Sequence, residues 1–482
     1  MDIKKYSPFV YQETAIEVGL EVLTSYKPRS EVLVAPVAAG KSIIIAEIVK
    51  RLPKDGNILV IQPNKELTEQ NIEKVESLGV KVSTYSASLG KKQLGRVTYA
   101  TPGSIDVVKF KKFGFKYCLF DEADWGSKDG TNLKRNLKLI GINNILGFTA
   151  TPIYMQQTLE GSVLKIMTRT RNPMFKDICH VIQIEEIVKN KRWAELKYIE
   201  YEFDSKGLIL NSTGSDYTEE SVIVNYVESN AESKILSIIN TIGKERALVF
   251  VPGIKNVDSL FKRLETEKIS VGYVHSKMSK KDREHTLKCF REGVIQVLIN
   301  SLVLLAGYDD PTLENLIDAF PTNSARVNYQ KIGRIVRVGK KVGKVHCISG
   351  NYEKFGSIED ITFENVENYG WGMFVKGFLV SGVPMKENIN ITKDDLINGR
   401  AKKNTNTKRK VSYDFVYQGN LESDKFTFGK YKGLTVAEVY SKDKGYLNWM
   451  YKMIKEQNAF GDKKNKSIKT KILELFDKSL PF

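Results

Sequence analysis

Cysteine is scarce in this chain, which has four among 482 residues. Cys118, Cys179, Cys289 and Cys347 lie far apart and form no C-x-x-C pair. This spacing argues against a zinc site and against a disulfide framework. It predicts reduced, mostly buried thiols in a cytoplasmic protein.

Long apolar runs are also absent. No stretch reaches the length that crosses a membrane, and the first six residues, MDIKKY, lack the apolar core of a signal peptide. We therefore expect no membrane partner and a cytoplasmic location, which would be the host cytoplasm if a phage encodes the chain.

Acidic residues are outnumbered. The chain has 57 Asp and Glu against 74 Lys and Arg, which gives a formal net charge of +17 and a pI near 9.3. Such an excess favours a polyanionic partner, although a generally basic surface is the alternative. The charge is spread along the chain, except that residues 400–410 hold six basic residues and no acid. We interpret residues 401–412 as a solvated linker.

The length suggests roughly three domains, and short apolar runs alternate with amphipathic stretches in two series. Near-continuous apolar strands that alternate with helices predict parallel sheets covered on both faces. Ligands bind such sheets beyond the carboxyl ends of the strands. We expect helical stretches near 228–239 and 355–400. The expected strands are 32–35, 58–61, 80–85, 96–100, 117–120 and 145–149, followed by 247–251, 271–274, 297–300, 316–319 and 345–348.

Residues 35–42, APVAAGKS, lie between an apolar run and a helix-like stretch. A strand, a tight loop and a helix N-terminus form the phosphate cradle of P-loop enzymes. The backbone around Ala38, Ala39 and Gly40 would hold the phosphates of ATP. Lys41 would add a charge at the β- and γ-phosphates, and Ser42 would bind Mg²⁺. The motif alone is weak, and a chance loop is the alternative.

Acidic residues follow a later apolar strand. Asp121 and Glu122 come after Tyr117–Phe120, and Asp124 follows two residues on. In this position Asp121 would hold Mg²⁺, and Glu122 would orient and deprotonate the attacking water. Farther along, Thr149 and Thr151 in the sequence TATP carry hydroxyls that can hydrogen-bond Asp124 and so couple the γ-phosphate site to the rest of the molecule.

A distal basic element reads QKIGRIVR from Gln330 to Arg337. Arg334 and Arg337 are three residues apart, so they would share one face if they lay on a helix. An arginine supplied by another lobe stabilises charge on a transferred phosphoryl group. A basic helix face without this role is the alternative. Upstream, Gly307 and Asp309 close a loop that can sense both nucleotide and nucleic acid.

Taken together, these motifs resemble those of superfamily two helicases, in order and spacing, over about residues 8–340. The resemblance implies an α/β fold with two tandem RecA-like lobes, each with a parallel sheet. It implies an ATP-dependent helicase in which Gln12 reads adenine and Gln330, Arg334 and Arg337 act with Lys41, Asp121 and Glu122. It also implies contacts to nucleic acid from Asn64, Lys65, Thr101, Gly103, Ser104, Pro252 and Ser301.

The amino-acid sequences of these motifs resemble those of the DNA-directed branch of the superfamily, which includes UvsW-type, RecG-type and XPB-type translocases. T-A-T-P, T-P-G-S and Q-K-I-G-R-I-V-R differ from the usual RNA-unwinding DEAD-box motifs. The compact size is most similar to phage UvsW-type enzymes, which remodel forks, displacement loops and Holliday junctions. One departure is Leu302, which stands where many relatives have Asp. Coupling between nucleotide and nucleic acid through that loop would therefore differ from that in the relatives.

The C-terminal segment resembles the small module that follows the nuclease domain in exonuclease X-like proteins, without the nuclease residues. Lys430 and Lys432 flank Tyr431, which suits contact with DNA, whereas Phe426, Phe428, Tyr446 and Trp449 suit a small core.

The predicted organisation is a first RecA-like domain at 1–195, a second at 196–400, the linker, and an α+β accessory module at 413–482. We expect a monomer that acts on branched DNA, together with replication or recombination proteins. The alternatives are an RNA helicase, a non-catalytic DNA-binding scaffold and a motor subunit of a restriction complex.

Overall fold

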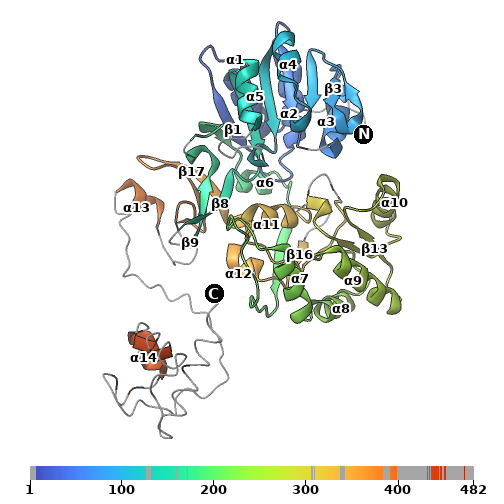
Figure 1. The fold of residues 1–482 in the computed structure, drawn as a ribbon, viewed down its shortest axis with the longest axis vertical. Helices are drawn as coiled ribbons and strands as arrows, with labels where there is room; N and C mark the ends of the chain where they lie inside the picture. Colours follow the sequence, from blue (N-terminus) through green and yellow to red (C-terminus); the bar gives the residue numbers. More distant parts are fainter. Residues whose placement is uncertain are drawn as a thin grey trace. The chain divides into compact units, whose positions relative to one another are not determined.

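The computed structural model describes residues 7–63, 65–125, 132–158, 161–170, 172–305, 308, 310–336, 342–383 and 391–398, with 431, 434, 436–443, 446–447, 450–451 and 472 near the C-terminus. The chain divides into two compact units, residues 1–406 and 407–482. The first unit holds two α/β lobes (Figure 1).

The first lobe is built on an eight-stranded sheet with the strand order β10-β1-β7-β6-β2-β5-β3-β4. All neighbours pair in parallel except β3 and β4. The strands are β1 (Ser30–Val34), β2 (Asn57–Ile61), β3 (Ser83–Ser86), β4 (Lys91–Lys92), β5 (Val97–Ala100), β6 (Phe115–Asp121), β7 (Asn144–Thr149) and β10 (Asp177–Val181). The helices are α1 (Val10–Thr24), α2 (Lys41–Arg51), α3 (Lys65–Ser77), α4 (Val107–Phe113), α5 (Asn132–Ile140) and α6 (Ile184–Lys189).

Strand order in this sheet brings three motifs together. β7 lies between β1 and β6, and the three strands run in the same direction. Their carboxyl ends therefore meet at one edge, where the residues that follow β1, β6 and β7 form a single site. The six strands expected in this lobe are confirmed, whereas β4 and β10 had no expected counterpart.

The second lobe has a six-stranded parallel sheet with the order β11-β16-β15-β12-β14-β13. Alternate residues of β12 enter two different apolar clusters, Leu248 and Phe250 in one and Ala247 and Val249 in the other. The sheet is thus covered on both faces, as predicted for near-continuous apolar strands. The strands are β11 (Glu195–Glu200), β12 (Ala247–Phe250), β13 (Val271–Val274), β14 (Val297–Asn300), β15 (Asn315–Asp318) and β16 (Val342–Cys347). The helices are α7 (Glu219–Glu228), α8 (Ala231–Ile242), α9 (Ile254–Thr266), α10 (Lys280–Arg291), α11 (Ala325–Ile332) and α12 (Asn351–Phe355).

The stretch at 355–400 was expected to be helical, and this was wrong for most of it. It forms an antiparallel sheet of β17 (Ile361–Val366), β18 (Gly370–Val375) and β19 (Phe378–Leu379), followed by the short helix α13 (Lys393–Ile397). Ile361 and Phe363 alternate with less buried residues in β17, and Gly370 and Gly377 have φ angles of 81° and 79° at the two turns. Alternation with period two and glycine turns produces a meander rather than helices.

This three-stranded sheet contacts the first lobe, although it follows the second lobe in sequence. Gln183 Nε2 donates to the Phe363 carbonyl at 2.6 Å, and Gly382 N donates to the Leu164 carbonyl at 2.6 Å. Leu164 belongs to the antiparallel hairpin of β8 (Ile153–Thr158) and β9 (Gly161–Ile166). The segment that contains β17–β19 thus follows the second lobe in sequence and packs against the first.

In the second unit, helix α14 (Val436–Lys442) carries Val436 and Val439 into a small apolar cluster. Tyr431 packs edge-on against Tyr446, and its hydroxyl donates to Asp443 at 2.6 Å. The Tyr431 ring thus takes part in a local packing contact. The other residues expected to contact DNA or form this core lie outside the described residues, namely Phe426, Phe428, Lys430, Lys432 and Trp449.

The four cysteines are unpaired, as predicted: Cys118 and Cys347 are buried, and Cys179 and Cys289 are partly buried. Across the described part of the chain, we find no helix with the length and apolarity needed to cross a membrane.

Candidate active site and nucleic-acid contacts

The loop between β1 and α2 has the backbone expected of a phosphate cradle. Ala38 and Gly40 both have positive φ angles, 66° and 82°. A side chain at Gly40 would also collide with Gln12, because an ideal Cβ there lies 2.4 Å from Gln12 Nε2. Only glycine fits this turn without strain, which explains the glycine before Lys41.

Gln12, in helix α1, hydrogen-bonds this loop. Its Nε2 donates to the Ala39 carbonyl at 2.8 Å, and its Oε1 accepts from Phe9 N at 3.0 Å. The side chain is 2% exposed. Gln12 therefore lies directly against the residues expected to hold the phosphates.

Lys41 is the centre of the charged cluster. Its ammonium lies 3.0 Å from Asp121 Oδ1 and also contacts Glu122 Oε1. Burial disfavours the charged form of Lys41, but the two carboxylates outweigh burial and raise its pKa. Lys41, Asp121 and Glu122, predicted as one site from motifs eighty residues apart, are thus in contact. Ser42 is the second residue of α2, next to this cluster.

Glu122 has the properties expected of a general base. Burial would raise the pKa of Glu122. The charge and hydrogen bond of Lys41, together with the charges of Arg326 and Arg334, outweigh burial, so the pKa of Glu122 is lowered. Its φ of 49° is left-handed, an uncommon conformation for a residue with a side chain. The carboxylate is therefore ionised at neutral pH and held in a fixed geometry.

Asn71 is a member of the site that the sequence did not reveal. It is 3% exposed on α3, and its Nδ2 donates to Asp121 Oδ2 at 3.1 Å. Asp121 Oδ1 also accepts from Glu122 N at 3.0 Å. No motif marks Asn71, because its role depends on where α3 packs.

Asp124 links the two lobes. Thr149 donates its hydroxyl to Asp124 Oδ1 at 2.8 Å, and Thr151 N donates to Thr149 Oγ1 at 3.0 Å. The predicted hydrogen bond between Thr149 and Asp124 is thus present. On its other side, Asp124 Oδ2 lies 2.5 Å from Nε of Arg326, which belongs to α11 of the second lobe. Arg326 was not among the predicted residues.

Helix α11 also contacts the phosphate loop directly. Val37 N donates to the Tyr329 hydroxyl at 3.4 Å, and Trp193 Nε1 donates to the Val37 carbonyl at 2.7 Å. An ideal Cβ at Gly333 would lie 2.7 Å from Val37 Cγ2. The glycine of the sequence QKIGR therefore allows the close approach of the second lobe to the loop.

Arg334 does not lie on a helix, which was the condition for a face shared with Arg337. Helix α11 ends at Ile332, and Gly333 follows as its C-cap. Beyond the helix, Arg334 is buried and donates through Nη1 to the Tyr308 carbonyl at 2.6 Å and through Nε to the Gln330 carbonyl at 3.2 Å. The predicted site residues Arg337, Gly307 and Asp309 lie outside the described residues.

The expected nucleic-acid contacts of the first lobe lie at the carboxyl end of β5. Thr101 and Ser104 hydroxyls are 2.9 Å apart, and Ser104 Oγ accepts from Ala87 N at 2.8 Å. Gly103 is exposed, with open space around it. Asn64 lies outside the described residues, and of Lys65 only its place at the start of α3 is described.

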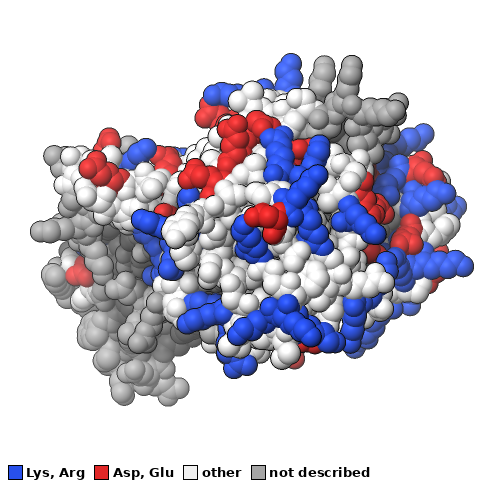
Figure 2. Space-filling model, turned by 90° about the horizontal axis from the view of Figure 1, so that it is seen from above, with Lys and Arg blue, Asp and Glu red and all other residues white. Residues whose placement is uncertain are grey.

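In the second lobe, Pro252, one of the residues expected to contact nucleic acid, is buried in this structure. The loop after β12 turns inward, and Gly253 beside it packs on Ile223. Ser301 is partly buried at the end of β14, and the next residue, Leu302, has a left-handed φ of 54°. Figure 2 shows basic side chains at many points of one face, with acidic side chains between them.

The two sheets and the contacts between the phosphate loop and α11 define a two-lobed P-loop protein. Family comparisons agree. The family described as DEAD/DEAH box helicase matches residues 10–159, and the helicase conserved C-terminal domain matches residues 230–339. The chain belongs to the superfamily two helicases, which are ATP-dependent enzymes. A third family, exodeoxyribonuclease X-like C-terminal, matches residues 426–455.

The relatives are distant. ATP-dependent RNA helicase DBP4 of Kluyveromyces lactis is 24% identical over 363 residues, 69% of this chain and 43% of that protein. A 51.5 kDa protein of Lactococcus phage (isolate 7-9) is 23% identical over 309 residues, 63% of this chain and 62% of that protein. The chain thus spans less than two thirds of the length of both.

Among solved structures, the Type ISP restriction-modification enzyme LlaBIII bound to DNA is similar with a TM-score of 0.53 and 17% identity. The similarity covers 71% of this chain and 28% of that one. At this identity it shows the fold alone.

Proposed function

We propose that this superfamily two helicase is a DNA helicase or translocase that unwinds or branch-migrates forks, displacement loops and Holliday junctions in replication, recombination or repair. The observation that carries the motor part of this proposal is the ion pair between Arg326 of α11 and Asp124, which lies two residues after Glu122, the partner of Lys41. It joins the nucleotide site of one lobe to a helix of the other.

In the proposed mechanism, ATP takes the Lys41 ammonium as a partner for its phosphates, which frees Glu122 from this ion pair. The ionised Glu122 then accepts a proton from the attacking water. Arg326 and Arg334, which already lower the pKa of Glu122, favour negative charge developing nearby. Thr149 keeps Asp124 oriented toward the second lobe.

A magnesium ion fits the residues at this site. The Asp121 carboxylate and the Ser42 hydroxyl are hard oxygen donors at the end of β6 and the start of α2, the ligand type that Mg²⁺ prefers. When bound, the ion would neutralise phosphate charge. Asn71 and Glu122 N hold the Asp121 carboxylate in place through the hydrogen bonds described above.

Alternating contact with nucleic acid would turn hydrolysis into movement. We expect the loop at Thr101–Ser104 and the loops of the second lobe to hold the phosphate backbone through N–H and hydroxyl donors, without reading sequence. Opening and closing of the lobes would then advance the enzyme along one strand. Binding should weaken strongly with salt.

The choice of DNA rests on the spelling of T-A-T-P, T-P-G-S and Q-K-I-G-R-I-V-R, and on the match of residues 426–455 to a C-terminal segment of exodeoxyribonuclease type. RNA is the second candidate substrate, because several curated relatives are named RNA helicases. The net charge of +17 suits either polyanion.

The experiment is steady-state ATP hydrolysis without nucleic acid and with single-stranded DNA, forked DNA, a Holliday junction or structured RNA. We expect the strongest stimulation with branched DNA and none in Lys41→Ala, which loses the cation at the site. Stimulation by RNA alone would replace DNA by RNA as the substrate. No turnover with any of these would favour a scaffold or a subunit that needs a partner.

A further inference from the structure

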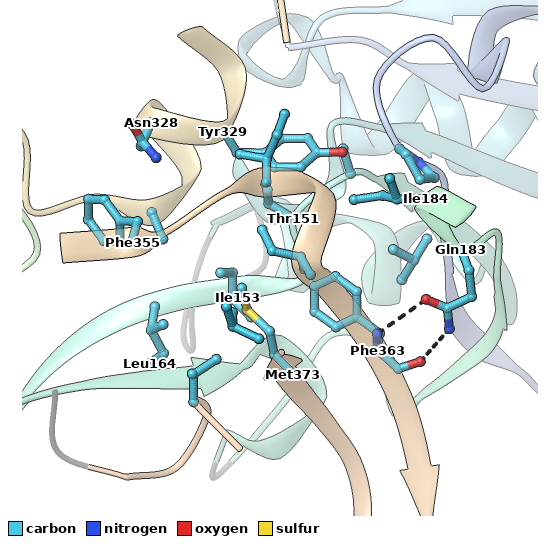
Figure 3. Close-up of a pocket in the computed structure, with 18 of the residues that line it drawn as sticks. Thr151, Ile153, Leu164, Gln183, Ile184, Asn328, Tyr329, Phe355, Phe363 and Met373 are labelled. Atoms are coloured by element: carbon cyan, nitrogen blue, oxygen red, sulfur yellow. Dashed lines mark hydrogen bonds between the residues drawn. The ribbon is translucent and has the colours of Figure 1, made fainter. Parts of the chain in front are cut away.

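A cavity of about 280 Å³ lies beside the nucleotide site. Its walls include Val34 at the end of β1, Thr151 after β7, residues of α11, and the sheet of β17 and β18 (Figure 3). Lys41, Asp121 and Glu122 are not part of the lining. In the strand order, β1 and β7 are separated from β5 by β6 and β2, so the cavity is also remote from Thr101–Ser104.

Most of the lining is apolar. Figure 3 shows Ile153, Leu164, Phe363 and Met373 around one space, with the Tyr329 ring above it. The backbone of Phe363 is held by the Gln183 side chain. Gln183 Nε2 donates to the Phe363 carbonyl at 2.6 Å, and Phe363 N donates to Gln183 Oε1 at 3.4 Å. The volume is close to the lower end, about 300 Å³, of the range for small-molecule pockets. The lining also has four aromatic side chains, Tyr329, Phe355, Phe363 and Phe378, so the walls suit a small aromatic body.

A buried acceptor lies on the α11 side of this cavity. Asn328 lines the cavity and is 2% exposed. Its Oδ1 has no hydrogen-bond partner within the described part of the protein. Buried amide oxygens are nearly always paired, so an unpaired one in a cavity wall indicates a missing donor.

A cation lies in the same wall. Lys354 at the end of α12 also lines the cavity. Its Nζ donates to the Tyr217 hydroxyl at 3.0 Å and to Asn323 Oδ1, and both acceptors are neutral. Among the described residues, no carboxylate lies within ion-pairing distance of it. The nearby Asp216 is already bonded to the Thr322 hydroxyl and to Asn323 N.

Burial makes this ammonium costly to keep charged. It lowers the pKa of Lys354 to about 8, and the negative charge of Asp216 opposes this only in part. An anionic group bound in the cavity would compensate the charge, just as a donor would satisfy Asn328.

We propose that this cavity binds a small aromatic monocarboxylate that carries a ring N–H or O–H donor. The carboxylate pairs with Lys354, the donor bonds Asn328 Oδ1, and the ring packs among Ile153, Phe363 and Met373. Such a ligand contacts both lobes and the sheet of β17–β19 at once. It therefore stabilises the observed lobe arrangement and slows ATP turnover, because the cycle requires the lobes to separate.

The test uses thermal unfolding of the full chain without nucleotide or nucleic acid, so that it is independent of the proposed substrate. The probe is indole-3-acetate, compared with indole-3-acetamide, which lacks the charge, and naphthalene-1-acetate, which lacks the donor. We expect indole-3-acetate to raise Tm the most. Equal shifts with all three compounds, or no shift, would overturn the proposal without any variant.

Two variants assign the contacts. Lys354→Met should weaken indole-3-acetate about tenfold, the loss expected for one charge-assisted contact, and remove the advantage over the acetamide. Asn328→Leu should remove the advantage over naphthalene-1-acetate. Lys376→Met is the control, because Lys376 is 69% exposed at the β18–β19 turn and outside the lining. Identical affinity in wild type and Lys354→Met would refute the site.

Discussion

Arg326 is the residue whose replacement tests the coupling between lobes most directly. Its Nε lies 2.5 Å from Asp124 Oδ2, and the two side chains are 33% and 3% exposed. Breaking a fully buried ion pair costs about 3–5 kcal/mol, whereas an exposed pair contributes about 0–1 kcal/mol. Because the carboxylate is buried but the guanidinium is partly solvated, we expect Arg326→Ala to cost about 1–3 kcal/mol.

If this contact is needed during hydrolysis, the lost interaction energy raises the activation barrier and lowers kcat. At about 1.4 kcal/mol per factor of ten, kcat of nucleic-acid-stimulated ATP hydrolysis should fall about 5- to 150-fold. Arg326→Lys keeps the charge without the planar geometry and should recover part of the loss. The pH profile should also move to higher pH, since Arg326 helps to lower the pKa of Glu122.

Steady-state ATPase assays of Arg326→Ala, Asp124→Asn and the double variant give the coupling energy of the pair, which we expect to exceed about 1 kcal/mol. Arg263→Ala is the matched control, because Arg263 is similarly exposed, at 37%, but pairs with Glu232 inside the second lobe. A wild-type kcat in Arg326→Ala, or an equal loss in Arg263→Ala, would refute the reasoning.

Two further predictions concern lobe contact and stability. Gly333→Ala places a methyl group 2.7 Å from Val37 Cγ2, so we expect ATPase activity to fall about tenfold and Val37→Ala to restore part of it; no rescue would contradict this contact. His346 is buried with Nδ1 bonded to Tyr201 and Nε2 to Asn315, and burial lowers its pKa from 6.5 to about 4. The unfolded chain therefore binds a proton more readily, and the free energy of unfolding should fall by up to about 3 kcal/mol as pH drops from 6.5 to 4. Urea unfolding should show a flatter dependence in His346→Gln but not in the exposed His285→Gln, and equal slopes in all three proteins would contradict it.

Most of the first-lobe site could be predicted from the sequence. A parallel sheet gathers whatever follows its strands at one edge, so polar residues after apolar runs are sufficient to place Lys41, Asp121, Glu122 and Thr149 together. The same logic supplied the eleven strands expected in the two lobes. Asn71 was missed because it lies in the middle of a helix, where no strand end or turn marks it.

The segment after the second lobe shows where a local pattern was misread. Residues 361–364 alternate between apolar and polar side chains, and Gly370 and Gly377 mark turns, so the strands were detectable. That this sheet contacts Gln183 and Leu164 of the first lobe was not detectable, because no periodicity specifies which surface a meander covers. Likewise, the spacing of Arg334 and Arg337 gives a shared face only on a helix, and α11 ends at Ile332, before Arg334.

The sequence by itself determined the class of protein, the strands and the residues around the phosphate loop, because short-range patterns and strand direction fix them. The tertiary structure decided that Asp124 pairs with Arg326, that Tyr329 and Gly333 approach Val37, and that a cavity with Lys354 and Asn328 forms beside the site. These contacts join residues far apart in the chain, and they depend on how two separately folded sheets pack against each other.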